Sequence, residues 1–258
     1  MSKRPRIITL DIETAPNVAH VWGIWQQNVG LNQILEEDSI LSFAYKVLGE
    51  DATYYMDVNN NKEKSVIKCI RDVLDKADIV IGHNFKKFDN KWILRQCLKY
   101  GLKPPSSYKI VDTLLASRAL MKLPSHRLDA VAKFLKCKHL KDTHKKFPGH
   151  SLWLGCLKGI KEAWKEMEHY NRQDVVVNEE VYLKLRPYIA NHPNVGVFRD
   201  EDVPVCPKCG SKHIHFRGYF HTNAGRYRKF QCQGCGGWGR LRKGVQSKDK
   251  RKVLAANA

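Results

Sequence analysis

The chain has 258 residues, of which 43% are hydrophobic, a composition typical of a globular protein rather than of a disordered one. It contains no apolar run of about 18 residues, and its basic N-terminus lacks the apolar segment of a signal peptide, so neither a membrane span nor secretion is predicted. The formal net charge of +19 makes a polyanion the expected partner. We therefore expect an intracellular protein, cytoplasmic or nucleoid-associated, that binds nucleic acid and no membrane.

Hydrophobic periodicity predicts a mixed order of strands and helices over most of the chain. The expected strands cover residues 7–14, 39–47, 52–57, 77–82 and 108–111. The expected helices cover residues 62–76, 87–100, 112 onward, 127–135 and about 158–185. Three strands followed by alternating helices and strands indicate an α/β domain.

Two segments of this domain follow neither period. Residues 15–37 carry two tryptophans, which either stack on nucleobases or anchor a loop to the core, and the second interpretation is favoured. Residues 136–155 are rich in Lys and His and are predicted as a loop; it is a candidate surface for a nucleic-acid strand, and a solvated face is the alternative. The candidate nucleic-acid contacts in the two segments are Trp22, Trp25, Lys145 and Lys146.

Four acidic residues stand at informative positions. Asp11 and Glu13 lie two apart in the first strand, so both project from the same face. Two like charges held together cost free energy unless they share a cation or a proton, although the pair alone also fits two solvated acids on an edge strand. Asp89 begins a helix after the apolar strand, where capping is an alternative role. Asp174 lies in the long helix, four residues after Tyr170 and on the same helical face.

In chain order, the patterns Asp11-x-Glu13, Asn84-x3-Phe88-Asp89 and Tyr170-x3-Asp174 resemble the three exonuclease motifs of the DEDD superfamily, the 3′→5′ exonucleases of RNase H-like fold. The resemblance covers about residues 6–190 and implies a mixed five-stranded sheet flanked by helices. It also implies that two Mg²⁺ or Mn²⁺ ions are bound by Asp11, Glu13, Asp89 and Asp174. Carboxylate oxygens suit these hard ions rather than zinc. Asn84 and Phe88 are candidate contacts to the nucleic acid.

The residue before the last acid divides this superfamily, with Tyr four positions earlier in one branch and His five positions earlier in the other. This chain has both Tyr170 and His169. Because an α-helix turns about 100° per residue, Tyr170 lies about 40° from Asp174 around the helix and His169 about 140° away. The Tyr branch is therefore favoured, with Tyr170 orienting the attacking water. Asp112 also resembles a recurrent superfamily position, but an N-cap role is the favoured interpretation.

Four of the eight cysteines form two C-x2-C pairs separated by 22 residues, with a glycine after each pair: Cys206, Cys209, Cys232 and Cys235. Four thiolates in this arrangement make a closed tetrahedral site for one structural Zn²⁺, and the segment resembles a zinc ribbon. A redox-active dithiol is the alternative. The remaining cysteines show no pairing pattern and are expected to be reduced thiols.

Basic and aromatic residues alternate between the two cysteine pairs, which predicts two ribbon strands whose exposed face binds phosphates and stacks on bases. The candidate contacts are Arg217, Tyr219, Arg226 and Arg228. Tyr219 and Phe230 are alternatively core residues, because so small a fold needs apolar filling. The predicted division of the chain is an RNase H-like domain at 1–195, a zinc ribbon at 196–242 and a basic flexible tail at 243–258.

The resemblance implies a metal-dependent 3′→5′ exonuclease that releases nucleoside 5′-monophosphates by a two-metal mechanism. The expected partners are single strands or 3′ ends, with DNA preferred over RNA, and replication or repair proteins. A structure-selective endonuclease or a ribonuclease on the same fold is the alternative enzyme. A non-catalytic nucleic-acid-binding protein is the alternative without chemistry, and the presence of all four carboxylates argues against it.

Overall fold

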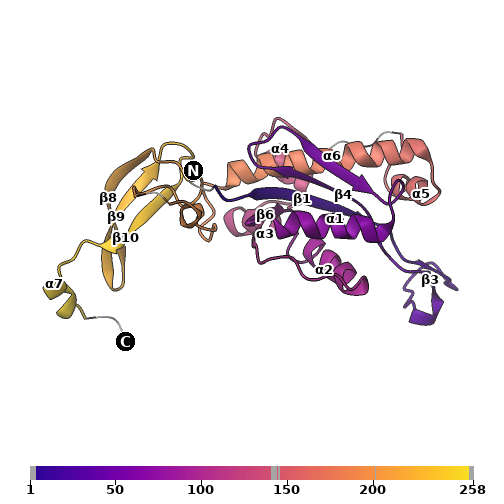
Figure 1. The fold of residues 1–258 in the computed structure, drawn as a ribbon, viewed down its shortest axis with the longest axis horizontal. Helices are drawn as coiled ribbons and strands as arrows, with labels where there is room; N and C mark the ends of the chain where they lie inside the picture. Colours follow the sequence, from indigo (N-terminus) through magenta and orange to yellow (C-terminus); the bar gives the residue numbers. More distant parts are fainter. Residues whose placement is uncertain (1–3, 141–143, 145, 201, 256–258) are drawn as a thin grey trace. The chain divides into compact units, whose positions relative to one another are not determined.

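The computed structural model describes residues 4–140, 144, 146–200 and 202–255. The chain divides into two compact units (Figure 1). The larger unit comprises Arg6–Arg118 and Lys122–Val181, and the smaller one is formed mainly by the chain after Val181. The larger unit therefore ends within the long helix, whereas the sequence predicts a domain boundary between residues 195 and 196.

A mixed five-stranded sheet forms the centre of the larger unit, in the order β5-β4-β1-β6-β7. β1 pairs with β4 antiparallel and with β6 parallel, β4 pairs with β5 antiparallel, and β6 pairs with β7 parallel. The strands are β1 (Ile7–Thr14), β4 (Ile40–Val47), β5 (Thr53–Asp57), β6 (Ile79–Gly82) and β7 (Lys109–Asp112). The predicted mixed sheet is confirmed, and β1 is its central strand.

Helices lie on both sides of this sheet (Figure 1). They are α1 (Glu63–Asp75), α2 (Asp89–Lys99), α3 (Thr113–Leu120), α4 (Leu128–Phe134), α5 (Ser151–Leu157) and α6 (Lys161–Leu185). α5 lies in the segment predicted as a loop, so that prediction is wrong for residues 151–155. Within the part of the chain that the structure describes, no helix is both long and apolar enough to cross a membrane.

The alternation of side chains along β1 separates two cores. Ile8, Leu10 and Ile12 are buried with apolar residues of α1 and α2, and each contributes about 1.5–3 kcal/mol by burial. A second apolar cluster joins α5 and α6 to Ala15 and Leu41. Because successive strand residues point to opposite faces, the face of β1 away from α1 and α2 is left for Thr9, Asp11 and Glu13.

The segment after β1 folds into a separate two-stranded sheet of β2 (Val18–Ala19) and β3 (Ile34–Glu36), joined through the short helix η1 (Leu31–Gln33). Two hydrogen bonds link residues within this segment: the His20 amide donates to the Gln33 carbonyl, and the Gln33 side-chain amide donates to the His20 carbonyl. As a result, Trp22 is 100% exposed and Trp25 is 84% exposed. The favoured prediction that these tryptophans anchor a loop to the core is wrong.

The smaller unit contains a three-stranded antiparallel sheet in the order β10-β9-β8. The elements are η2 (Val195–Phe198), β8 (Ile214–Thr222), β9 (Gly225–Cys232), β10 (Trp238–Gly244) and α7 (Lys248–Lys252). The sequence predicts β8 and β9 but not β10. The predicted flexible tail contains the end of β10 and the helix α7, whose first turn is capped by the Ser247 hydroxyl accepting from the Lys250 amide.

Candidate functional site

Three carboxylates from distant parts of the chain meet beside the central strand. Asp11 and Glu13 project from the same face of β1, and Asp174 comes from the packed face of α6. Carboxylate oxygens of the three residues all lie within 4.8 Å of one another. Asp174 is buried, and like charges at this separation repel, so the cluster favours a bound cation. Hard oxygen ligands of this kind fit Mg²⁺ or Mn²⁺.

The fourth predicted carboxylate, Asp89, is the buried first residue of α2 and is hydrogen-bonded to β1. Its Oδ1 accepts a hydrogen bond from the Ile12 amide at 3.1 Å, between Asp11 and Glu13 on the strand. Burial is the main cause that raises the pKa of Asp89 to about 7; the charge of Asp112 adds to the rise, and hydrogen bonds from the backbone amides of Asp89 and Ile12 oppose it. Asp89 does not belong to the group with mutual oxygen distances below 4.8 Å. A cation at the cluster favours its charged form.

Asn171 holds one of the clustered carboxylates in position. Its Nδ2 donates a hydrogen bond to Asp11 Oδ2 at 2.7 Å, and its Oδ1 accepts one from the Ser42 hydroxyl at 3.2 Å. Asn171 and Ser42 are both fully buried, so the orientation of Asp11 is fixed by β4 and α6 together. Sequence reasoning missed Asn171. The one available signal was its position three residues before Asp174, which places both on one helical face.

Tyr170 lies in the same site, one residue before Asn171. Its ring is buried and packs edge-on against His144 and Trp153, with ring centroids 5.1 and 5.9 Å away. Tyr170 lines the cleft that contains Asp174, whereas the His169 side chain is exposed and is not among the residues that line it. The geometry therefore agrees with the helical-wheel argument for Tyr170.

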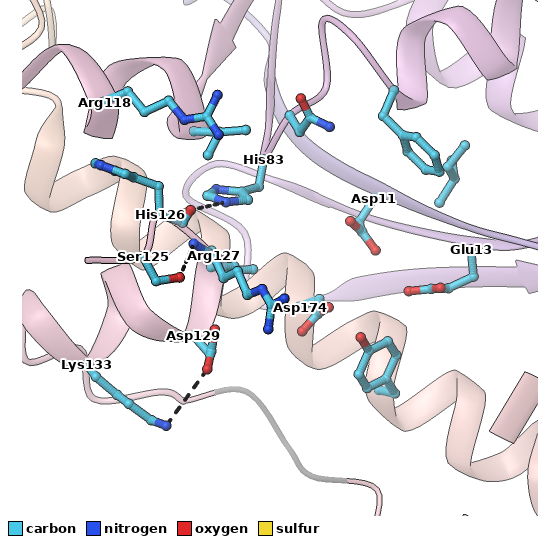
Figure 2. Close-up of a pocket in the computed structure, with 16 residues that line it drawn as sticks. Asp11, Glu13, His83, Arg118, Ser125, His126, Arg127, Asp129, Lys133 and Asp174 are labelled. Carbon is cyan, nitrogen blue, oxygen red and sulfur yellow. Dashed lines mark hydrogen bonds and ion pairs between the residues drawn. The ribbon is translucent and has the colours of Figure 1, made fainter. Parts of the chain in front are cut away.

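An open cleft of about 820 Å³ contains the carboxylate cluster (Figure 2). Figure 2 shows Arg118, His126 and Lys133 across the cleft from Asp11 and Glu13. Two of the predicted nucleic-acid contacts, Asn84 and Phe88, also line it. The other contacts predicted in this unit are Trp22, Trp25 and Lys146, which are not among the described lining residues, and Lys145, which lies outside the described residues.

Asp112 shapes the turn that carries Asn84 into the cleft. Its carboxylate accepts hydrogen bonds from the amides of Asn84 and Lys86, both at 3.1 Å, and from the Leu114 amide at 3.0 Å. The Leu114 bond caps the N-terminus of α3, so the predicted N-cap role is confirmed. Asn84 has a φ of +66°, a left-handed conformation that Asn adopts more readily than most residues.

His83 is a second residue that sequence reasoning did not select. Its Nε2 donates to the His126 carbonyl at 2.9 Å, and its Nδ1 lies 3.0 Å from the Thr113 hydroxyl. These contacts join β6 to the segment before α4, which forms the far wall of the cleft. A histidine next to a strand end carries no sequence signal for such a contact.

The four cysteines of the smaller unit form a second candidate metal centre. Their sulfur atoms all lie within 4.8 Å of one another, with 3.8 Å between Cys206 and Cys235 and 3.5 Å between Cys209 and Cys232. Tetrahedral zinc with bonds of about 2.3 Å places sulfur atoms about 3.8 Å apart. The four residues therefore fit one structural Zn²⁺.

The same turn follows each cysteine pair. The Gly210 amide donates to the Cys206 carbonyl at 2.8 Å, and the Gly236 amide donates to the Cys232 carbonyl at 2.9 Å. Both glycines have positive φ, +73° and +75°, which explains why glycine occupies these positions. The repeated turn agrees with the predicted zinc ribbon.

The chain is similar in sequence or in fold to known proteins. Residues 10–186 match the family RNase_H_2, described as RNase H superfamily, and this range includes all four predicted metal-binding carboxylates. A DNA polymerase III PolC-type from Ureaplasma parvum serovar 3 is 40% identical over 77 residues, which are 30% of this chain and 5% of that polymerase. The family B DNA polymerase of the hyperthermophilic archaeon Pyrobaculum calidifontis has a TM-score of 0.50 and 15% identity.

The structural match covers 72% of this chain and 25% of the archaeal polymerase, and at that identity it concerns the fold alone. This chain thus spans a small part of the length of either polymerase. The family match covers more than half of the chain, from β1 to the end of α6, and it agrees with the sheet order and the clustered acids. The chain belongs to the RNase H superfamily.

Proposed function

We propose that this chain is a metal-dependent 3′→5′ exonuclease that hydrolyses phosphodiester bonds and releases nucleoside 5′-monophosphates. The observation that carries the proposal is the convergence of Asp11, Glu13 and Asp174 in an open cleft on an RNase H fold. The net charge of +19 supports a nucleic-acid substrate.

The residues that would hold two divalent ions are Asp11, Glu13, Asp89 and Asp174. When bound, two such ions about 4 Å apart supply an activated water and stabilise the charge on the leaving 3′-oxygen. Tyr170 lines the same cleft, and its hydroxyl would orient the attacking water by hydrogen bonding. The hydrogen bond from Asn171 holds the Asp11 carboxylate in one orientation before the reaction begins.

The proposed substrate is a single strand or a 3′ end, with DNA preferred over RNA. The sequence relative is a DNA polymerase by name, which supports the preference for DNA. Arg118, Arg127 and Lys133 in the far wall provide positive charge for the phosphates, and Phe88 provides a half-exposed ring for the terminal base. Replication or repair proteins are the proposed protein partners.

A strand labelled at its 5′ end tests the proposal directly. With Mg²⁺, the label is expected to move through a ladder of successively shorter products, and DNA is expected to be degraded faster than RNA of the same sequence. A circular single strand has no 3′ end and should remain intact. Cleavage of the circle would instead assign the site to an endonuclease, and absence of cleavage on every substrate would leave only nucleic-acid binding.

Replacing Tyr170 with Phe is expected to lower the cleavage rate about a hundredfold, because the variant keeps the packed ring but loses the hydroxyl that orients the water. Single-turnover cleavage with saturating Mg²⁺ measures the effect. His169→Ala is the matched control on the neighbouring position and should retain nearly full activity. Full activity in Tyr170→Phe together with loss in His169→Ala would reverse the assignment of the two residues.

A further inference from the structure

The sheet of the smaller unit has two chemically different faces. Because directly paired residues of antiparallel strands share a face, the pairs Ile214–Cys232, Phe216–Phe230 and Phe230–Gly239 define one of them. Phe230 and Cys232 are fully buried, so this is the core face of the ribbon. A Cβ at Gly239 would lie 2.5 Å from the Phe230 ring, which shows how closely the ring covers β10.

The opposite face carries aromatic rings that no ribbon core explains. We call it the aromatic face and define it by Phe220 of β8, Tyr227 and Lys229 of β9, and Trp238 and Arg240 of β10. The pairs Phe220–Tyr227 and Lys229–Arg240, and the alternation along β9 and β10, place all five on one side of the sheet. Phe220 and Trp238 are exposed, so the aromatic face presents rings at the surface.

Cations lie over these rings rather than apart from them. The Arg240 guanidinium is 4.1 Å from the centroid of Tyr227 and 5.5 Å from that of Phe220, so it links all three strands. Lys229 Nζ is 5.1 Å from the centroid of Trp238. The sequence from residue 214 to 244 contains no Asp or Glu, so no carboxylate of this sheet neutralises the two cations.

We propose that the aromatic face binds single-stranded nucleic acid, with unpaired bases stacking on Phe220, Tyr227 and Trp238 and with phosphates contacting Lys229 and Arg240. Aromatic rings interleaved with cations bind a single strand because every base has a π-face and every nucleotide has a phosphate. A duplex fits less well, since its bases are already stacked on one another. This surface goes beyond the proposed exonuclease, because binding here requires no cleavage.

The proposal moves the ribbon contacts to a different face from the one that the sequence suggests. Tyr219 pairs with Arg228, and alternation along β9 places Arg226, Arg228 and Phe230 on the core face. Tyr219 and Trp238 are each 48% exposed, and each has a cation over its ring. They therefore form a matched pair of exposed aromatic residues on opposite faces of one sheet.

Binding of a fluorescent single strand of about 15 nucleotides to the full chain, measured by anisotropy without Mg²⁺, tests the proposal. Trp238→Ala and Phe220→Ala should each raise Kd about tenfold, whereas Trp238→Phe, which keeps a π-face, should recover most of the affinity. Tyr219→Ala, the control on the core face, should stay within about twofold of the wild type. A strand of abasic sites should bind wild type weakly and should not distinguish the variants.

Equal or greater loss in Tyr219→Ala, or no loss in Trp238→Ala, would overturn the assignment to the aromatic face. Duplex binding as tight as single-strand binding would overturn the stacking of bases. If an alanine variant purifies without zinc, Lys229→Gln and Arg240→Gln replace it. Each of these substitutions should reduce the slope of log Kd against log salt concentration by the amount expected for the loss of about one phosphate contact. An unchanged slope would also overturn the proposal. Because no Mg²⁺ is present, these results are independent of whether the larger unit cleaves nucleic acid.

Discussion

Replacing Asp11 with Asn is expected to reduce Mg²⁺-dependent cleavage about a thousandfold or more, the largest catalytic effect that the proposed function predicts. Asn has nearly the same shape and keeps an oxygen for the hydrogen bond that Asn171 donates, so the fold should survive. It removes one of the negative charges that the three clustered residues offer to a cation. A loss of about 4 kcal/mol of transition-state stabilisation corresponds to this factor.

Two measurements separate loss of the ion from loss of the fold. Calorimetric titration with Mn²⁺ should show weaker binding in Asp11→Asn, while the melting temperature changes little. Asp129→Asn is the control, because Asp129 lines the same cleft but forms an exposed ion pair with Lys133 at 3.9 Å. Such pairs contribute about 0–1 kcal/mol, so the control should retain its activity. Equal losses in the two variants would contradict the assigned role of the cluster.

Replacing Cys206 with Ser is expected to unfold the ribbon while the larger unit stays folded. The sheet of β8, β9 and β10 buries few apolar side chains, and a unit of this size rarely folds on its core alone. Structural zinc contributes about 10–16 kcal/mol of apparent binding free energy in zinc-finger peptides, which such a small core does not replace. Removing one of four thiolates opens the site and forfeits most of this stabilisation.

Zinc content and amide NMR signals measure this outcome together. The wild type should carry one zinc per chain and show dispersed signals for β8–β10, whereas Cys206→Ser should lose both and keep the signals of the larger unit. Cys69→Ser is the control, because Cys69 is a partly buried cysteine outside the cluster. Retention of a full equivalent of zinc by Cys206→Ser, or a dispersed ribbon spectrum after chelation, would refute a four-cysteine structural site.

The parts of the fold that the sequence predicts are those with a regular hydrophobic periodicity. The alternation along β1 and the helical spacing of Val66, Ile67 and Ile70 in α1 directly reflect which side chains are buried. β10 lacks this signal, because none of its side chains is buried and its Gly239 is a residue type more common in loops than in strands. The reason for that glycine is the Phe230 ring lying over it, a contact that only the folded sheet creates.

The candidate site divides in the same way. Asp11, Glu13 and Asp174 were predictable because short motifs in a fixed order carry them on recognisable elements. Asn171 was not, because its role depends on a hydrogen bond across 160 positions of sequence. Trp22 and Trp25 were misjudged for a related reason, since aromatic residues usually enter a core unless the segment pairs with itself, as β2 and β3 do.

The long sequence separation between Asp11 and its partners also bears on how the chain is made. During synthesis β1 emerges well before Asn171 and Asp174, because Asn171 follows Asp11 by 160 positions of sequence. A nascent chain therefore presents Asp11 and Glu13 without the helix that orients and completes the set. Since the three carboxylates come together only on tertiary folding, an ion held by all three would join β1 to α6. Such an ion stabilises the finished fold by mass action and leaves the partial chain unaffected.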